Sequence, residues 1–160
     1  MSRVHRFFVD EHIKLKKDFW LHDPALIWQW NKVLRFSEGQ EAILFDGLGT
    51  DRLYRIVKID RTEAHLQMIT ELESNLPSRN VYLLFSLLKK DNNEHILQKA
   101  CELGVSNFVP LLSERTIKKD FNIERARKIV VEASEQCGRS NIPHVRDPVH
   151  LDKALAEYHG

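Results

Sequence analysis

The stretch Ala100–Thr116, "ACELGVSNFVPLLSERT", decides the fold of the second half of the chain. It holds the end of a helical pattern, a stop at Gly104, an apolar strand at Asn107–Leu112 and then a polar loop. A helix that leads directly into an apolar strand is the repeating unit of a parallel α/β sheet. The loop after the strand carries Arg115, at the sheet edge where such folds bind their ligands.

The segments on both sides of this stretch continue the same pattern. The apolar run Val81–Leu88 has the length expected of a parallel strand buried on both faces. A helix is predicted from about Asn122 to Cys137, with Gly138 as its stop, and a short strand at Ile142–Val145 and a last helix follow. The order β-α-β-α-β-α predicts a parallel sheet with right-handed crossovers.

The first part of the chain, between Phe7 and Thr70, has the pattern of short strands separated by turn residues. The strand-like segments are RFFV, AILFD, RLYRIVKI and AHLQMIT. They predict a small antiparallel β-barrel. One helix interrupts the strands at Asp23–Pro24, a capping residue followed by a proline. Its expected inward face consists of Leu26, Trp30, Val33 and Leu34.

A polar segment with a proline, Glu73–Ser78, separates the two patterns and is typical of a linker. We therefore predict two domains, a β-barrel at residues 1–74 and an α/β domain at residues 79–160. The fold class is α+β with two domains.

Composition restricts the classes of protein to which the chain can belong. The 160 residues are 42% hydrophobic and carry a formal net charge of +1, which is typical of a globular protein without a polycationic tail. No segment approaches the roughly 20 apolar residues that span a bilayer, so we expect a cytoplasmic protein without membrane contact. Cys101 and Cys137 fall in helical patterns with no CxxC pair, which predicts two buried thiols, no disulfide and no metal site.

Polar residues gather in the loops that should lie at the carboxyl ends of the parallel strands. Arg115 follows the second strand, and Arg139 with Gln136 lies at the end of a helix. A guanidinium there could reach a phosphate or a base carbonyl. Alternatively, Arg115 could pair with Glu102 or Glu135 and only hold the loop to a helix. The sequence leaves both interpretations open.

The tryptophans have two possible roles, as core residues or as platforms for nucleic-acid bases. Trp30 lies at helical spacing beside Leu26 and Val33, which favours the core. Trp28 points to another side of the same helix, and its role stays open.

The order of motifs resembles one family, the RsmE-like 16S ribosomal RNA (uracil-N3)-methyltransferases of bacteria. The segments that carry the resemblance are VLRFSEGQ (33–40), LFDGLG (44–49), LLKKDNNEHILQKACELGVSNFVPLLSERT (87–116) and EASEQCGRSNIPHV (132–145). The resemblance implies a PUA-like RNA-binding β-barrel followed by a SPOUT domain. The SPOUT domain is a parallel α/β domain whose C-terminal trefoil knot binds S-adenosylmethionine. It also implies a homodimer that acts on 16S ribosomal RNA or the small ribosomal subunit.

The chain has no counterpart of the glycine-rich GPEGG loop and of the late leucine-arginine segment that build the knot in this family. We therefore expect the N-terminal barrel and the first half of the SPOUT domain, with the knot missing. Such a fragment should bind no S-adenosylmethionine and should be inactive by itself. A stand-alone RNA-binding module without catalysis is the alternative.

The resemblance also suggests roles for individual residues. Methylation of uracil N3 requires the base to be oriented and negative charge on its carbonyl oxygens to be stabilised, for which arginines are suited. The expected base-facing residues are Arg115, Arg139 and Gln136. The residues expected to orient them are Glu102 and Glu135. The expected phosphate contacts on the barrel are Arg35, Arg52 and Arg55.

Overall fold

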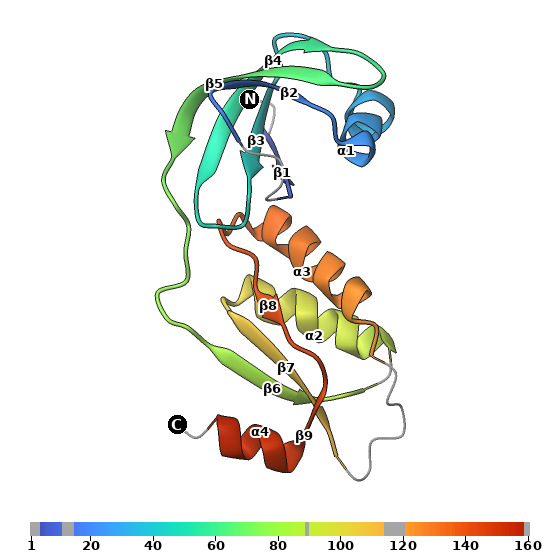
Figure 1. The fold of residues 1–160 in the computed structure, drawn as a ribbon, viewed down its shortest axis with the longest axis vertical. Helices are drawn as coiled ribbons and strands as arrows, with labels where there is room; N and C mark the ends of the chain where they lie inside the picture. The colour runs from blue at the N-terminus through green and yellow to red at the C-terminus, as the bar shows by residue number, and fades with distance from the viewer. Residues whose placement is uncertain (1–3, 11–14, 89, 114–120, 159–160) are drawn as a thin grey trace. The chain divides into compact units, whose positions relative to one another are not determined.

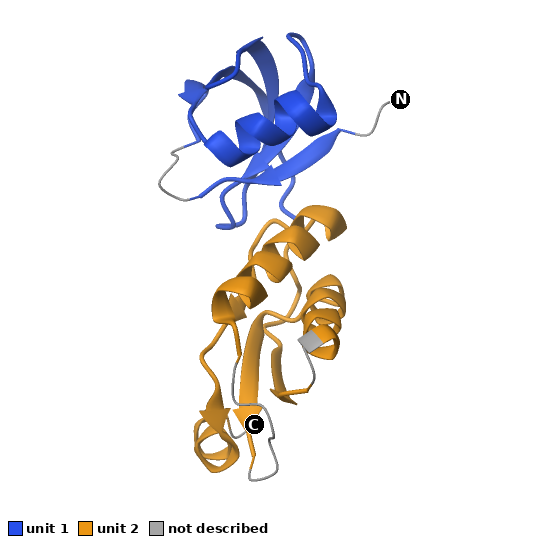
Figure 2. Cartoon of the chain, turned by 90° about the vertical axis from the view of Figure 1, so that its right-hand side faces the viewer, with its two compact units in different colours: residues 1–75 blue, residues 76–160 orange. Residues whose placement is uncertain are grey.

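The computed structural model describes residues 4–10, 15–88, 90–113 and 121–158. The chain divides into two compact units, Met1–Asn75 and Leu76–Gly160, coloured blue and orange in Figure 2. The boundary falls inside the predicted linker, Glu73–Ser78. Each unit has its own hydrophobic core.

Unit 1 is built on a five-stranded sheet with the order β1-β3-β4-β5-β2 (Figure 1). The strands are β1 (His5–Phe8), β2 (Asp18–Leu21), β3 (Glu41–Phe45), β4 (Asp51–Ile59) and β5 (Ala64–Leu72). All neighbouring pairs are antiparallel except β1 and β3, which are parallel. The prediction of a wholly antiparallel barrel is wrong at this pair, because the chain passes through β2 and a helical segment before it returns as β3.

The helical segment of unit 1 begins as predicted and then changes its winding. α1 (Pro24–Trp28) is capped by Asp23, whose carboxylate accepts hydrogen bonds from two backbone amides at 3.0 Å. It continues as a π-helix, η1 (Gln29–Leu34), and ends at Arg35 in a left-handed conformation. The wider turn of a π-helix shifts the later side chains around the axis. Val33 is consequently 58% exposed, so its predicted place in the inward face is wrong.

The core of unit 1 is centred on Trp30, as predicted. This side chain is fully buried. Its ring centroid lies 5.4 Å from that of Phe7 and 5.6 Å from that of Phe36. The contact with Phe7 of β1 packs the helical segment against the sheet.

Unit 2 has a parallel sheet, as predicted, but its order is β-α-β-α-β-β-α, with two short strands where the sequence predicted one (Figure 1). Its elements are β6 (Tyr82–Ser86), α2 (Lys90–Glu102), β7 (Asn107–Leu112), α3 (Ile123–Cys137), β8 (His144–Val145), β9 (Val149–His150) and α4 (Leu151–Glu157). β7 is central: β6 pairs with it on one side, and β8 and β9 pair with it in succession on the other.

Side chains of β7 alternate between two layers of helices. Phe108 packs in the cluster formed with α2 and α3, whereas Val109 and Leu111 pack with Ala154 of α4. This alternation follows from the period of two in a β-strand. Helices α2 and α3 thus cover one face of the sheet and α4 the other (Figure 1).

Two predictions about burial in unit 2 are wrong. The segment Val81–Leu88 is not buried on both faces, since Val81, Tyr82 and Leu88 are 42%, 41% and 46% exposed. Cys101 is buried as predicted, but Cys137, at the end of α3, is exposed. No helix among the described residues is long and apolar enough to cross a membrane.

Candidate functional site

The carboxyl ends of β6, β7 and β8 define the edge of the unit 2 sheet at which parallel α/β folds place their sites. The described part of β7 and its following loop ends at Ser113. Arg115, the residue predicted to deliver chemistry there, lies outside the described residues. Its role stays a prediction.

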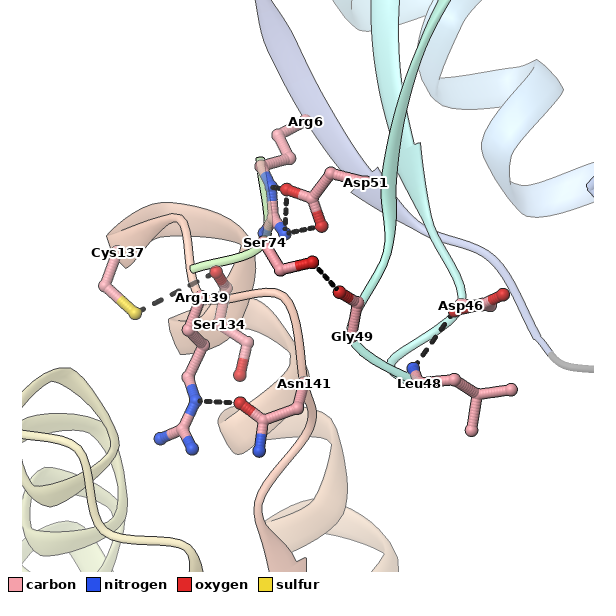
Figure 3. Close-up of polar contacts among 10 residues, drawn as sticks. All are labelled: Arg6, Asp46, Leu48, Gly49, Asp51, Ser74, Ser134, Cys137, Arg139 and Asn141. Atoms are coloured by element: carbon pink, nitrogen blue, oxygen red, sulfur yellow. Dashed lines mark hydrogen bonds and ion pairs between the residues drawn. The ribbon is translucent and has the colours of Figure 1, made fainter. Parts of the chain in front are cut away.

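Arg139 is directed into the fold. The residue is buried, with only 4% of its surface exposed. Nη1 donates to the carbonyl oxygens of Cys101 at 3.0 Å and Val105 at 2.8 Å. Nε donates to Asn141 Oδ1 at 3.2 Å, as the dashed line in Figure 3 shows. Arg139 therefore ties the end of α2 to the loop after α3.

The remaining predicted residues of unit 2 have different surroundings. Gln136 is exposed and Glu135 is half-buried on α3. Glu102 accepts from Lys99 Nζ at 2.9 and 3.1 Å, a pair within one helix turn. Among the described residues, Glu102 forms its ion pair with Lys99 and not with an arginine. Its role in orienting an arginine stays a prediction.

The two thiols differ in chemical environment. Burial raises the pKa of the Cys101 thiol, and Ser134 Oγ lies 3.4 Å from its sulfur. Ser134 Oγ also donates to the carbonyl oxygen of Val130 at 2.7 Å. Cys101 is consequently a neutral packing residue and not a nucleophile.

A pocket of about 530 Å³ surrounds the turn between β8 and β9. Its lining includes Arg127, Arg146 and Lys153 as cations. Arg146 donates to Glu157 Oε1 at 2.8 Å, and its guanidinium carbon lies 5.3 Å from the ring centroid of Tyr158. The sequence placed a loop here but gave no signal for the pocket, because Glu157 and Tyr158 approach only in the folded unit.

This pocket does not match the sulfonium cofactor that the resemblance implies. S-adenosylmethionine carries a positive charge on sulfur, and the lining adds three permanent cations to only two carboxylates, Asp147 and Glu157. One of these carboxylates is already paired with Arg146. The lining of this pocket is therefore not complementary to a sulfonium group. The described residues include no cluster of side chains able to hold a metal ion.

The predicted phosphate contacts of unit 1 have unequal access to a ligand. Arg52 Nε lies 3.3 Å from Glu71 Oε1, and Arg52 Nη1 lies 3.6 Å from Asp46 Oδ2. Arg55 Nη2 lies 3.2 Å from Glu41 Oε1. Arg35 is exposed, and no described carboxylate forms an ion pair with it. A phosphate would compete with a carboxylate at the first two arginines but not at the third.

Unit 1 also has a tryptophan whose side chain, unlike that of Trp30, is exposed to solvent. Trp28 is 61% exposed, with Lys32 and Arg61 in the lining of a pocket beside it. The sequence indicated only that Trp28 points away from the core. The approach of Arg61 depends on tertiary structure, because this residue lies in the turn between β4 and β5.

The two units correspond to two families of domains. Residues 74–160 match the RNA methyltransferase domain, and residues 32–69 match the RNA methyltransferase PUA domain. The first match covers more than half of the chain. The chain therefore belongs to the RNA methyltransferase family, with a PUA-type domain before the α/β domain.

Within this family, the chain resembles ribosomal RNA small subunit methyltransferase E. It is 32% identical over 133 residues to that protein of Aquifex aeolicus, a match that covers 79% of this chain and 57% of the relative. It is 35% identical over 132 residues to that of Synechocystis, covering 81% and 43%. The chain thus spans about half the length of the curated relatives that it matches.

A solved structure supports the same fold. Ribosomal RNA small subunit methyltransferase E of Neisseria gonorrhoeae, bound to S-adenosyl methionine, superimposes with a TM-score of 0.86 at 27% sequence identity. The match covers 99% of this chain and 67% of that structure. The PUA-like and SPOUT architecture implied by the sequence motifs is thereby confirmed.

Proposed function

We propose that this chain is the RNA-facing part of an S-adenosylmethionine-dependent methyltransferase that modifies N3 of a uracil in 16S ribosomal RNA. The observation that carries the proposal is the succession of a PUA-type domain and an RNA methyltransferase domain in one chain. Relatives that share this order over most of the chain are ribosomal RNA small subunit methyltransferases. The cytoplasm, where ribosomal subunits are assembled, is the proposed location.

Unit 1 is proposed to hold the RNA. Its candidate phosphate contacts are Arg35, Arg52 and Arg55. Because Arg52 and Arg55 are each already paired with a carboxylate, we expect Arg35 to contribute more to affinity than either. All three would make binding depend on salt rather than on base sequence.

Unit 2 is proposed to orient the target base. N3 of uracil must lose its proton before it accepts a methyl group, and the charge that develops spreads onto the carbonyl oxygens of the base. Cationic donors stabilise such charge. Arg115 is the proposed donor, and Gln136 is exposed and able to donate from its amide. Arg139, buried against backbone carbonyls, is proposed as a positioning residue.

The pocket around the turn between β8 and β9 offers no excess of negative charge to a sulfonium group. We propose that the 160-residue chain neither binds the cofactor nor transfers a methyl group by itself. The second candidate function is an RNA-binding module without catalysis.

A homodimer is proposed for the complete protein. Unit 2 exposes large apolar side chains at Leu103, Leu151 and Leu155, which a partner surface would cover. Light scattering coupled to size-exclusion chromatography measures this directly: a mass of two chains is expected, and a single-chain mass at all concentrations would contradict it.

Methyl transfer tests the proposed function. The chain, extended to a complete methyltransferase domain of its family, is incubated with S-adenosylmethionine and small ribosomal subunits from a strain that lacks the modification. Mass spectrometry of nucleosides should detect 3-methyluridine in 16S ribosomal RNA, and the 160-residue chain alone should produce none. A methyl group on another base would contradict the uracil-N3 assignment.

A further inference from the structure

Trp28 is an exposed tryptophan on a helical segment whose other tryptophan, Trp30, is fully buried. Burial of Trp30 accounts for the attachment of the segment to the sheet. Trp28 takes no part in the core cluster of unit 1. A large aromatic side chain held in water is typical of a binding surface.

The indole forms one wall of a pocket of about 340 Å³, within the range of roughly 300–1,000 Å³ that is common for ligand sites. The lining consists of Pro24, Trp28, Asn31, Lys32, Arg61 and Thr62, which we call the Trp28 face. This lining contains two cations and no carboxylate. Its charge is therefore complementary to an anionic ligand.

Hydrogen bonds hold the two sides of the Trp28 face together. Asn31 Nδ2 donates to the carbonyl oxygen of Asp60 at 2.8 Å, which joins the helical segment to the turn that carries Arg61. Asp60 Oδ1 accepts from Thr62 N at 2.7 Å, Thr62 Oγ1 at 2.9 Å and Glu63 N at 3.0 Å. The turn is therefore formed before any ligand arrives, which lowers the entropic cost of binding.

The cations of the Trp28 face are available to a ligand. Neither Lys32 nor Arg61 forms an ion pair with another residue in the described part of the chain. Arg52 and Arg55, by contrast, each lie within salt-bridge distance of a carboxylate. A phosphate at the Trp28 face would therefore not compete with a carboxylate of the described residues.

We propose that the Trp28 face binds single-stranded RNA, with an unstacked base on the indole of Trp28 and the adjoining phosphates on Lys32 and Arg61. The inference rests on the proposed function, which makes RNA the substrate, and adds the site that holds it. An aromatic face flanked by cations is the arrangement that single-stranded RNA selects. A protein partner would be complementary to the two cations only if it supplied carboxylates of its own.

The first test measures the affinity of the 160-residue chain for a short unstructured RNA by fluorescence anisotropy. Trp28→Ala should weaken binding about 10-fold or more, because the stacking contribution of one base is lost. Trp28→Phe should retain affinity within about 3-fold, because a smaller ring still stacks. Trp20→Ala is the matched control: Trp20 is 41% exposed, but His65 already stacks on it at 4.8 Å between ring centroids. This control should bind as tightly as the original chain.

The second test separates the phosphate contacts. Lys32→Ala and Arg61→Ala should each weaken RNA binding. Each variant should also make the affinity less dependent on salt, because RNA binding then releases about one counterion fewer. Arg125→Ala is the control, because this exposed arginine is paired with Glu94 at 3.0 Å in unit 2. Thermal unfolding of every variant verifies that unit 1 remains folded.

The outcomes distinguish this inference from the function on which it rests. If the original chain binds RNA and folded Trp28→Ala binds equally well, the Trp28 face is not the site, while the proposed function stands. If the original chain binds no RNA, both are overturned. If Trp28→Ala abolishes self-association and leaves RNA binding unchanged, the face is a contact between copies of the chain, and the inference is overturned.

Discussion

Arg6 and Asp51 form a buried ion pair that crosses β3 in unit 1 (Figure 3). Arg6 Nε donates to Asp51 Oδ2 at 2.9 Å, and Nη2 donates to Oδ1 at 2.8 Å and to Oδ2 at 2.7 Å. The guanidinium also lies 3.7 Å from the ring centroid of Phe45. The pair thus links β1, the parallel strand, to β4 across the strand between them.

Removal of one member of this pair should strongly destabilise unit 1. Asp51→Ala should lower the free energy of unfolding by about 3–5 kcal/mol, because it removes the carboxylate and three hydrogen bonds from the buried guanidinium. Chemical denaturation measures the change. Glu41→Ala, which breaks the exposed pair with Arg55, is the control and should cost less than about 1 kcal/mol. Equal losses for the two variants would contradict a special role for the buried pair.

Arg139 should contribute to the stability of unit 2 whether or not a ligand is bound. Arg139→Ala removes the hydrogen bonds to the carbonyl oxygens of Cys101 and Val105 and should cost roughly 2–4 kcal/mol. Gln136→Ala, an exposed neighbour, should change stability by less than about 0.5 kcal/mol. An Arg139→Ala variant that unfolds like the original chain but no longer supports methyl transfer in the complete enzyme would show that Arg139 contacts the substrate.

Tyr54 should make the stability of unit 1 depend on pH in the alkaline range. Burial raises the pKa of Tyr54 from 10.0 to about 12, and its hydroxyl donates to the carbonyl oxygen of Lys16 at 2.8 Å. The folded protein holds this proton more tightly than the unfolded chain does. The stabilisation is therefore fully present below pH 10 and is lost as pH rises toward 12.

The comparison with Tyr54→Phe tests this dependence. The variant should lose about 1 kcal/mol below pH 10 and should show a smaller alkaline loss than the original chain. Urea denaturation across this pH range measures both. Parallel pH profiles for the two proteins would exclude Tyr54 as the group responsible.

The two cysteines should react at very different rates. Cys137 is exposed and should be modified quickly by a thiol reagent in the folded protein. Cys101 is buried and its thiol pKa is raised, so it should react only when unit 2 unfolds. Cys137→Ser should abolish the fast reaction. Two fast equivalents of modified thiol would mean that the core around Cys101 opens readily.

Local patterns predicted most of the elements of this chain. Asn122 caps α3 and Gly138 ends it, because capping and left-handed conformations depend on nearby residues alone. β2 was not predicted, although the equally short β1 was. The π-helix that exposes Val33 was equally hidden, because its side-chain spacing differs from the helical period on which the prediction relied.

The candidate sites were less predictable than the elements. Proximity in sequence grouped Arg139 with Gln136, but the fold buries the first and exposes the second. The ion pair of Arg6 with Asp51 and the approach of Arg61 to Trp28 join residues that are distant in sequence. A motif shows which residues are present, whereas the direction of each side chain depends on packing between elements.

We propose that residues 1–160 recognise RNA and do not bind S-adenosylmethionine by themselves. A titration of the 160-residue chain with a 16S ribosomal RNA fragment, at low and high salt and with and without S-adenosylmethionine, tests it most directly. We predict affinity that falls as salt rises and does not change when the cofactor is added. Absence of RNA binding, or an affinity that changes with S-adenosylmethionine, would contradict the account.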